Sequence, residues 1–247
     1  MHRFFISPEN INNSNATIDD EQARHIERVL RLATGDLVMA FDGQGNEYEL
    51  CLSGRQEGKL RAEIRSVHVE NREPSLKITL VQGLTKGDKM DTIIQKAVEI
   101  GVAEVYPLIS QHSVIHLDQK RAARKVERWQ SIAREACKQC RRNQIPVVNM
   151  PIKLNDFLDL SQGNPVILLY ENENCTSLKA LIENNKDMLR QKVFLIVGPE
   201  GGFSTAEVSQ AARKGALTAG LGPRILRTET AGLVASAILL YEMGDLE

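Results

Sequence analysis

Two glycine-proline loops near the C-terminus carry the residues whose types and spacing could do chemistry. The first, GPEGG at 198–202, follows five apolar residues and precedes Ser204 and Glu207, which have the spacing of a helix capping box. The second, GPR at 222–224, precedes a predicted helix that Thr228 can cap. Such glycines either shape a structural turn or let a ligand approach backbone amides, and their spacing alone leaves both interpretations open.

The residues of the two loops restrict the kind of ligand. No Gly-Lys-Ser/Thr sequence follows the glycines, so the P-loop pattern of phosphate-binding proteins is absent. Glu200 lies inside the first loop, where its negative charge would repel a bare phosphate. A neutral or partly cationic nucleoside, bound by backbone amides and carbonyls, suits these loops better.

Alternating strands and helices, predicted from Leu76 onward, would position both loops. Apolar runs predict buried strands at 76–84, 165–170 and 193–197, with helical periodicity between them. This alternation is typical of an α/β domain with a mostly parallel sheet. Because the carboxyl ends of parallel strands lie at one edge of a sheet, the loops that follow these strands could form one pocket.

A different pattern covers the first 73 residues. Short alternating strands and one helix indicate a small β-barrel, and a phase shift after Arg65 predicts a β-bulge. The sequence NREPS at 71–75 is typical of a linker. We therefore predict two domains, 1–73 and 74–247.

Two basic stripes could bind phosphate groups, although the net charge of −1 gives no general argument for a nucleic-acid partner. Arg24, Arg28 and Arg31 share one face of the N-terminal helix, and that face could equally be solvated. The long helix predicted at 118–142 carries nine Lys and Arg residues against three acidic residues. This excess favours a phosphate-binding surface over a solvated face.

Composition also bounds the location of the protein. The longest apolar run, 232–241, is too short to cross a bilayer, and the N-terminus is not a signal peptide. We therefore expect a cytoplasmic protein with reduced cysteines and no membrane partner. Cys137 and Cys140 form a single CxxC without a second pair, late in a helix, so we expect a buried structural pair and no metal site.

Several longer stretches resemble one enzyme family. GPEGGFS at 198–204 and LGPRILRTETA at 221–231 are similar to the SPOUT, or α/β-knot, methyltransferases. DKMDTIIQKAVEIGV at 88–102, VERWQSIAREACKQCRR at 126–142 and the N-terminal MHRFF…HIERVLRLATGD narrow the resemblance to the ribosomal small-subunit methyltransferase E family. The resemblance covers nearly the full chain, with the motifs in the same order.

The resemblance implies both a fold and an activity. The expected fold is a parallel-sheet α/β domain with a deep trefoil knot, preceded by a PUA-like β-barrel that helps bind RNA, in a homodimer. The expected activity is methylation of N3 of a uridine in 16S rRNA, with S-adenosylmethionine as cofactor. The alternatives are a SPOUT methyltransferase that acts on a ribose 2′-hydroxyl or another base, and a non-catalytic RNA-binding or ribosome-assembly protein.

The resemblance also places the expected cofactor contacts at three strand ends. They are Leu169, Tyr170, Gly198, Glu200, Gly201, Gly202, Leu221, Gly222, Ile225, Leu226, Arg227, Thr230 and Ala231. The candidate RNA-binding residues are Arg3, Arg24, Arg28, Arg31, Arg124, Lys125 and Arg128. Two residues are candidates for chemistry: Arg227 could stabilise a uracil anion or merely form an ion pair, and Glu200 could accept a proton.

Overall fold

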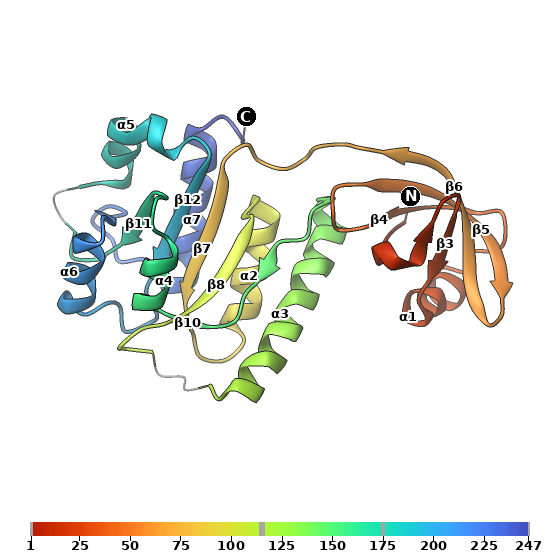
Figure 1. Cartoon of the computed structure of the whole chain (residues 1–247), viewed down its shortest axis with the longest axis horizontal. Helices are drawn as coiled ribbons and strands as arrows, with labels where there is room; N and C mark the ends of the chain where they lie inside the picture. Colours follow the sequence, from red (N-terminus) through yellow and green to blue (C-terminus); the bar gives the residue numbers. More distant parts are fainter. Residues whose placement is uncertain (1, 114–116, 174–175, 247) are drawn as a thin grey trace. The chain divides into compact units, whose positions relative to one another are not determined.

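The computed structural model describes residues 2–113, 117–173 and 176–246, and contacts within the chain divide it into two units (Figure 1). Unit 1 comprises Met1–Glu73 and Cys137–Ile145. Unit 2 comprises Pro74–Ala136 and Pro146–Glu247. The break after Glu73 lies within the predicted linker. However, Cys137–Ile145 also belongs to unit 1, which a single boundary at residue 73 does not predict.

Unit 1 is built on one sheet. Its strand order is β1 (Arg3–Phe5), β4 (Leu37–Phe41), β5 (Glu47–Gln56), β6 (Lys59–His68), β3 (Asn15–Ile18) and β2 (Ile11–Asn12). β1 and β4 are parallel, and the other neighbours are antiparallel. Glu49 pairs with Ser66 and Leu50 with Ile64, so Arg65 is the extra residue of a bulge, as predicted.

A helical segment that follows β3 packs on this sheet. α1 (Asp20–Arg24) is capped by Asp19, whose carboxylate accepts a hydrogen bond from the Gln22 amide at 2.8 Å. The chain then widens into one π-helical turn (His25–Val29), where a single α-helix was predicted. Ile26 from this turn is fully buried in the core of unit 1.

A buried ion pair and a hydrogen bond join Cys137–Ile145, which begins in the last turn of α3 (Gln119–Cys140), to the rest of unit 1. Arg142 contacts Glu73 at 3.1 Å, and both side chains are at least nine-tenths buried. Arg3 forms an ion pair with Glu47 at 2.8 Å and donates to the carbonyl of Cys137 at 2.9 Å. Since buried charges need partners, these contacts hold the segment in unit 1.

Unit 2 contains the predicted parallel sheet. Its strand order is β10 (Ile152–Lys153), β8 (Glu104–Ile109), β7 (Lys77–Gly83), β12 (Lys192–Val197), β11 (Val166–Leu169) and β13 (Leu217–Ala219), with β9 (Val147–Val148) also beside β8. Every described pairing is parallel, which confirms the expected α/β class. The trefoil knot implied by the resemblance stays a prediction.

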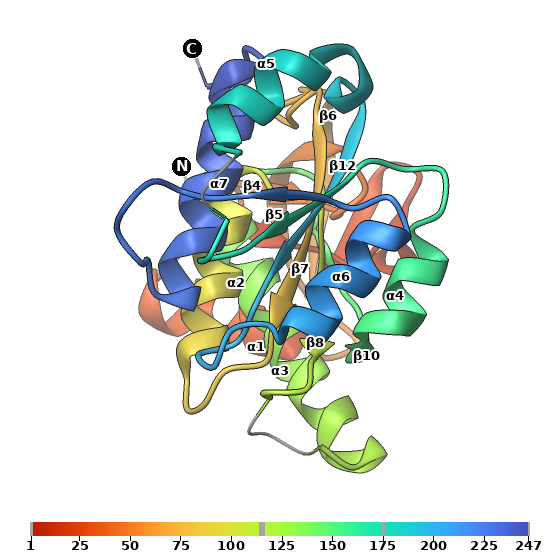
Figure 2. The same ribbon diagram turned by 90° about the vertical axis from the view of Figure 1, so that its left-hand side faces the viewer.

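Helices cover both faces of this sheet (Figure 2). α4 (Leu154–Leu160) and α6 (Thr205–Arg213) lie over one face, and α2 (Lys89–Ile100) and α7 (Thr228–Glu242) lie over the other. α5 (Leu178–Leu189) precedes β12. The capping box of Ser204 and Glu207 is confirmed, as is the end of α2 at Gly101 in the left-handed conformation, with a φ of 118°.

The predicted cap of the last helix was wrong. Arg227 is the N-cap residue of α7 and makes no side-chain capping bond, and Thr228 is already the first helical residue. Its hydroxyl instead donates to the carbonyl of Gly198, 30 residues earlier. A tertiary contact has replaced the local one that the sequence pattern suggested.

Candidate active site

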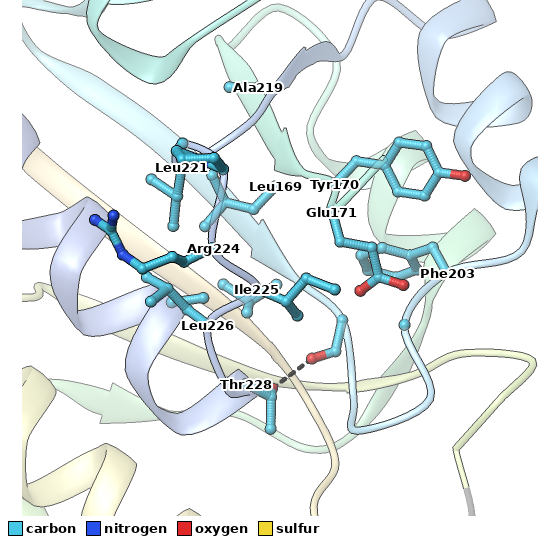
Figure 3. Close-up of a pocket in the computed structure, with 16 residues that line it drawn as sticks. Leu169, Tyr170, Glu171, Phe203, Ala219, Leu221, Arg224, Ile225, Leu226 and Thr228 are labelled. Carbon is cyan, nitrogen blue, oxygen red and sulfur yellow. Dashed lines mark hydrogen bonds between the residues drawn. The ribbon is translucent and has the colours of Figure 1, made fainter. Parts of the chain in front are cut away.

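A pocket of about 760 Å³, its open mouth included, lies where β11, β12 and β13 end and their following loops meet (Figure 3). This is the edge at which parallel sheets bind ligands. The lining residues are Leu169, Tyr170, Glu171, Val197, Gly198, Gly202, Phe203, Ala219, Leu221, Gly222, Pro223, Arg224, Ile225, Leu226, Thr228 and Ala231.

The pocket unites most of the residues expected to contact a cofactor. The predicted residues that line it are Leu169, Tyr170, Gly198, Gly202, Leu221, Gly222, Ile225, Leu226 and Ala231. Glu200, Gly201, Arg227 and Thr230 were also predicted but do not line it. The lining residues that sequence reasoning missed adjoin or lie close to predicted ones in the chain, so extending each predicted stretch by two residues would have found them.

The first loop packs tightly against the end of β7. A Cβ added to Gly83 would lie 2.3 Å from the nitrogen of Pro199 and 2.6 Å from the carbonyl carbon of Gly198. Only glycine allows this approach of two backbones. The loop then turns at Gly202, which has a φ of 65° and donates its amide to the carbonyl of Pro199 at 3.0 Å.

Two consecutive hydrogen bonds hold the first loop against β7 and the start of α7. The amide of Gln82, a fully buried side chain on β7, donates to the hydroxyl of Thr228 at 2.8 Å. Thr228 in turn donates to the carbonyl of Gly198 at 2.5 Å (Figure 3). This buried chain of bonds joins β7, the first loop and the start of α7, and its burial makes each bond costly to lose.

Glu200 belongs to this loop but does not line the pocket. Its carboxylate accepts from the amide of Lys86 and from the ammonium of Lys89, both at 3.3 Å. Partial burial alone would raise the pKa of Glu200, but hydrogen bonds from its own backbone amide, from Lys86 and from Lys89 outweigh this effect and lower the pKa. A carboxylate with a lowered pKa is a weaker base, so the geometry favours a role in holding the loop.

Arg227 is placed differently from Glu200. Its side chain is 82% exposed and its guanidinium lies 3.9 Å from Glu229. Arg227 occupies the N-cap position of α7, between the lining residues Leu226 and Thr228, but does not itself line the pocket. An exposed cation at this position remains able to meet a negatively charged substrate group.

The candidate RNA-binding residues differ in how exposed their side chains are. The side chain of Arg3 is 9% exposed and bonds to Glu47 and to the carbonyls of Cys137 and Arg142, which leaves it little access to RNA. Arg128 contacts Asp91 at 2.9 Å, and this aspartate also accepts from the indole of Trp129. Arg128 is nevertheless exposed, as are Arg24, Arg28, Arg31 and Arg124, whereas Lys125 is half-buried beside Trp129.

Three further observations concern the cysteines, metal ions and membranes. Burial raises the pKa of the Cys137 thiol to about 12, so this side chain is an inert core residue at neutral pH. Within residues 2–113, 117–173 and 176–246, no cluster of His, Cys, Asp or Glu side chains could hold a metal ion. In the same part of the chain, no helix combines the length and apolar character needed to span a membrane.

Comparison with known proteins agrees with this geometry. A family model described as an RNA methyltransferase domain matches residues 71–240, and one described as an RNA methyltransferase PUA domain matches residues 18–65. The ribosomal RNA small subunit methyltransferase E of Bacillus subtilis is 34% identical, over 92% of this chain and 90% of that protein. The Buchnera aphidicola protein of the same name is 31% identical, over 93% and 89%.

A solved structure is similar over its whole length. The ribosomal RNA small subunit methyltransferase E of Neisseria gonorrhoeae, bound to S-adenosylmethionine, is 34% identical and superposes with a TM-score of 0.87 over 100% of both chains. The strand order, the pocket and these similarities all agree with the resemblance noted in the sequence. The chain therefore belongs to the ribosomal RNA small subunit methyltransferase E family of RNA methyltransferases.

Proposed function

We propose that this chain transfers the methyl group of S-adenosylmethionine to N3 of a specific uridine in the 16S rRNA of the small ribosomal subunit. Family membership supports a methyltransferase that uses S-adenosylmethionine on small-subunit rRNA. The choice of uridine N3 rests on the family resemblance of the two loops. The observation that carries the proposal is the pocket where three parallel strands end, in a chain of this family.

The residues of the pocket fit this cofactor. The pocket lies at the carboxyl ends of parallel strands, where such sheets bind small molecules. Apolar side chains such as Leu169, Leu221 and Ile225 suit an adenine ring, while the glycine loops expose backbone groups that can hydrogen bond to it. When bound, S-adenosylmethionine supplies a methyl group activated by a positively charged sulfur.

The chain's own residues would position the substrate and stabilise its charge. The bonds from Gln82 through Thr228 to Gly198 hold the pocket walls in place, which lowers the entropic cost of aligning two reactants. Arg227 is our candidate for the cation that stabilises a uracil deprotonated at N3. We assign Glu200 to loop support, since its lowered pKa makes it a poor proton acceptor.

We further propose a role for each unit. Unit 1, which includes the region that matches the PUA family, would contact RNA through Arg24, Arg28 and Arg31. In unit 2, Arg124 and Lys125 on α3 would contribute further phosphate contacts. A homodimer, as the resemblance implies, belongs to the same proposal.

Labelled methyl transfer tests the activity directly. Purified protein would be incubated with unmodified small ribosomal subunits and S-adenosylmethionine carrying a labelled methyl group, followed by mass spectrometry of the nucleosides. We expect labelled 3-methyluridine. Label on a ribose or on another base would indicate a different methyltransferase. Unlabelled rRNA, with cofactor binding intact in calorimetry, would favour a non-catalytic RNA-binding or assembly protein.

Charge reversal tests the surface on α3. Changing Arg124 and Lys125 together to Glu should weaken rRNA binding about tenfold and lower the slope of log affinity against log salt by about 2, because fewer counterions are released when two phosphate contacts are lost. Lys179→Glu with Lys186→Glu, on the exposed side of α5, is the matched control. Equal effects of both pairs would show a general charge effect and no binding surface on α3.

A further inference from the structure

Glu171 brings a negative charge to the pocket. It lies two residues after the end of β11, and of the lining residues only Glu171 and Arg224 are charged. Figure 3 shows the Glu171 carboxylate beside Phe203, whereas the guanidinium of Arg224 points away from it. The charge that faces a ligand in this pocket is therefore the carboxylate.

The first loop leaves room for this carboxylate. A Cβ added to Gly202 would lie 2.9 Å from Oε1 and 3.2 Å from Oε2 of Glu171. The side chain thus packs directly against the backbone of the loop at a position where a larger residue would displace it. This contact connects the end of β11 with the loop after β12 across the pocket wall.

No residue that the structure describes neutralises this charge. Within that part of the chain, Glu171 takes part in no hydrogen bond or ion pair, although Glu173 two residues later accepts from the hydroxyl of Thr218 at 2.7 Å. The side chain of Glu171 is exposed, so water can reach its carboxylate when no ligand is bound. A ligand that covers the carboxylate removes this water, so binding is favourable only if the ligand supplies a cation or a hydrogen-bond donor.

We propose that Glu171 is a specificity-determining residue that recognises a cationic group of the cofactor. This inference rests on the proposed function. S-adenosylmethionine carries two cationic groups, the sulfonium and the α-ammonium of its amino-acid end. Recognition of the sulfonium would favour the substrate form of the cofactor over the product, S-adenosylhomocysteine, which has lost that charge. If Glu171 recognises the ammonium, the pocket should bind both forms equally and should disfavour cofactor fragments that lack the amino-acid end.

Calorimetric titration with three ligands separates these cases. S-adenosylmethionine has both cations, S-adenosylhomocysteine has only the ammonium, and 5′-methylthioadenosine has neither. Glu171→Gln should weaken S-adenosylmethionine binding about tenfold, with the loss shrinking at high salt, and leave 5′-methylthioadenosine unchanged. An unchanged affinity for S-adenosylhomocysteine would identify the sulfonium, and an equal loss would identify the ammonium.

Two further variants serve as controls. Glu183→Gln, on the exposed side of α5, removes the same charge away from the pocket and should change no affinity. Glu171→Asp keeps the charge and should retain most of the preference for S-adenosylmethionine over 5′-methylthioadenosine, even if the Gln variant folds poorly.

Two outcomes would overturn the inference. An equal loss of affinity for all three ligands would place Glu171 on a group common to them, such as a ribose hydroxyl. An unchanged affinity for S-adenosylmethionine in Glu171→Gln would exclude any recognition. In both cases the wild-type protein still binds the cofactor, so the proposed function would stand, whereas absence of wild-type binding would defeat the function itself.

Discussion

The two loops that wall the pocket differ in how firmly the fold holds them. The loop at 198–202 is packed backbone to backbone against Gly83, bonded to Thr228 and flanked by the Lys89–Glu200 ion pair. The loop at 221–226 is more open: Ile225 is 80% exposed, and a Cβ on Gly222 would meet nothing within 4 Å. We infer that the loop at 198–202 is a preformed wall of the pocket, and that the loop at 221–226 is a wall that becomes ordered when a ligand binds.

This contrast has a functional consequence. A preformed wall lowers the cost of binding because its groups are already oriented. An open wall lets ligand enter and leave, and it leaves Arg227 exposed near the point where substrate would arrive. Substitutions in the first loop should therefore damage folding and binding together, while substitutions in the second should act mainly on binding.

A pair of glycine substitutions should give the largest contrast. Gly83→Ala forces a Cβ into the backbone of the first loop and should cost about 3 kcal/mol of unfolding free energy, because neither side can move as a flexible side chain would. Gly222→Ala has free space, and its φ of 92° should cost only about 1 kcal/mol. Urea denaturation measures both, and similar losses would contradict the contrast between the loops.

Loss of the buried hydroxyl should have the next largest effect. Thr228→Val keeps the shape of the side chain but leaves the amide of Gln82 and the carbonyl of Gly198 without that partner, at a cost of about 2 kcal/mol. Thr205→Val is the matched control, because Thr205 is the exposed first residue of α6. The two unfolding free energies should differ clearly. A cost as small as that of the control would mean that the buried chain of bonds does not hold the loop.

The ion pair at Glu200 should contribute least. Its lowered pKa means that the carboxylate stabilises the fold above its unfolded pKa, near 4.5, and that this contribution is lost as the pH falls through the folded value. Because the pair is partly exposed, Glu200→Gln should cost under about 1 kcal/mol of unfolding free energy at pH 7 and less at about pH 3, as measured by urea denaturation. An equal cost at both pH values would contradict a contribution from the charge.

Kinetics of the same variant decide whether Glu200 takes part in the reaction. Methyl transfer by Glu200→Gln should stay within about tenfold of wild type, since the loop keeps its other contacts. A loss of several hundredfold in the rate, with cofactor affinity unchanged, would instead identify Glu200 as a proton acceptor.

Local features of both units could be predicted from the sequence because they depend on neighbouring residues. The apolar run of β12, the capping box of Ser204 and Glu207, the left-handed Gly101 and the bulge at Arg65 all leave signatures within a few positions. The pocket was predicted because strand ends of a parallel sheet converge, and the family resemblance supplied its residues.

Features that depend on distant partners could not be predicted in this way. Arg3 was expected to contact RNA, but its partners lie 44 and more positions away, and no local pattern records them. Thr228 has the residue type of a helix cap, yet a carbonyl 30 residues earlier takes its hydroxyl. Likewise, no composition change marks the segment from Cys137 as part of unit 1.

Amide hydrogen exchange with and without S-adenosylmethionine tests the central claim most directly, since it reports on each loop separately. In the free protein, amides in the loop at 198–202 should exchange slowly and those at 221–226 quickly. Saturating cofactor should slow exchange strongly at 221–226 and little at 198–202. Fast exchange at 198–202 in the free protein, or no protection of either loop by cofactor, would contradict the account of a preformed wall and a ligand-completed wall.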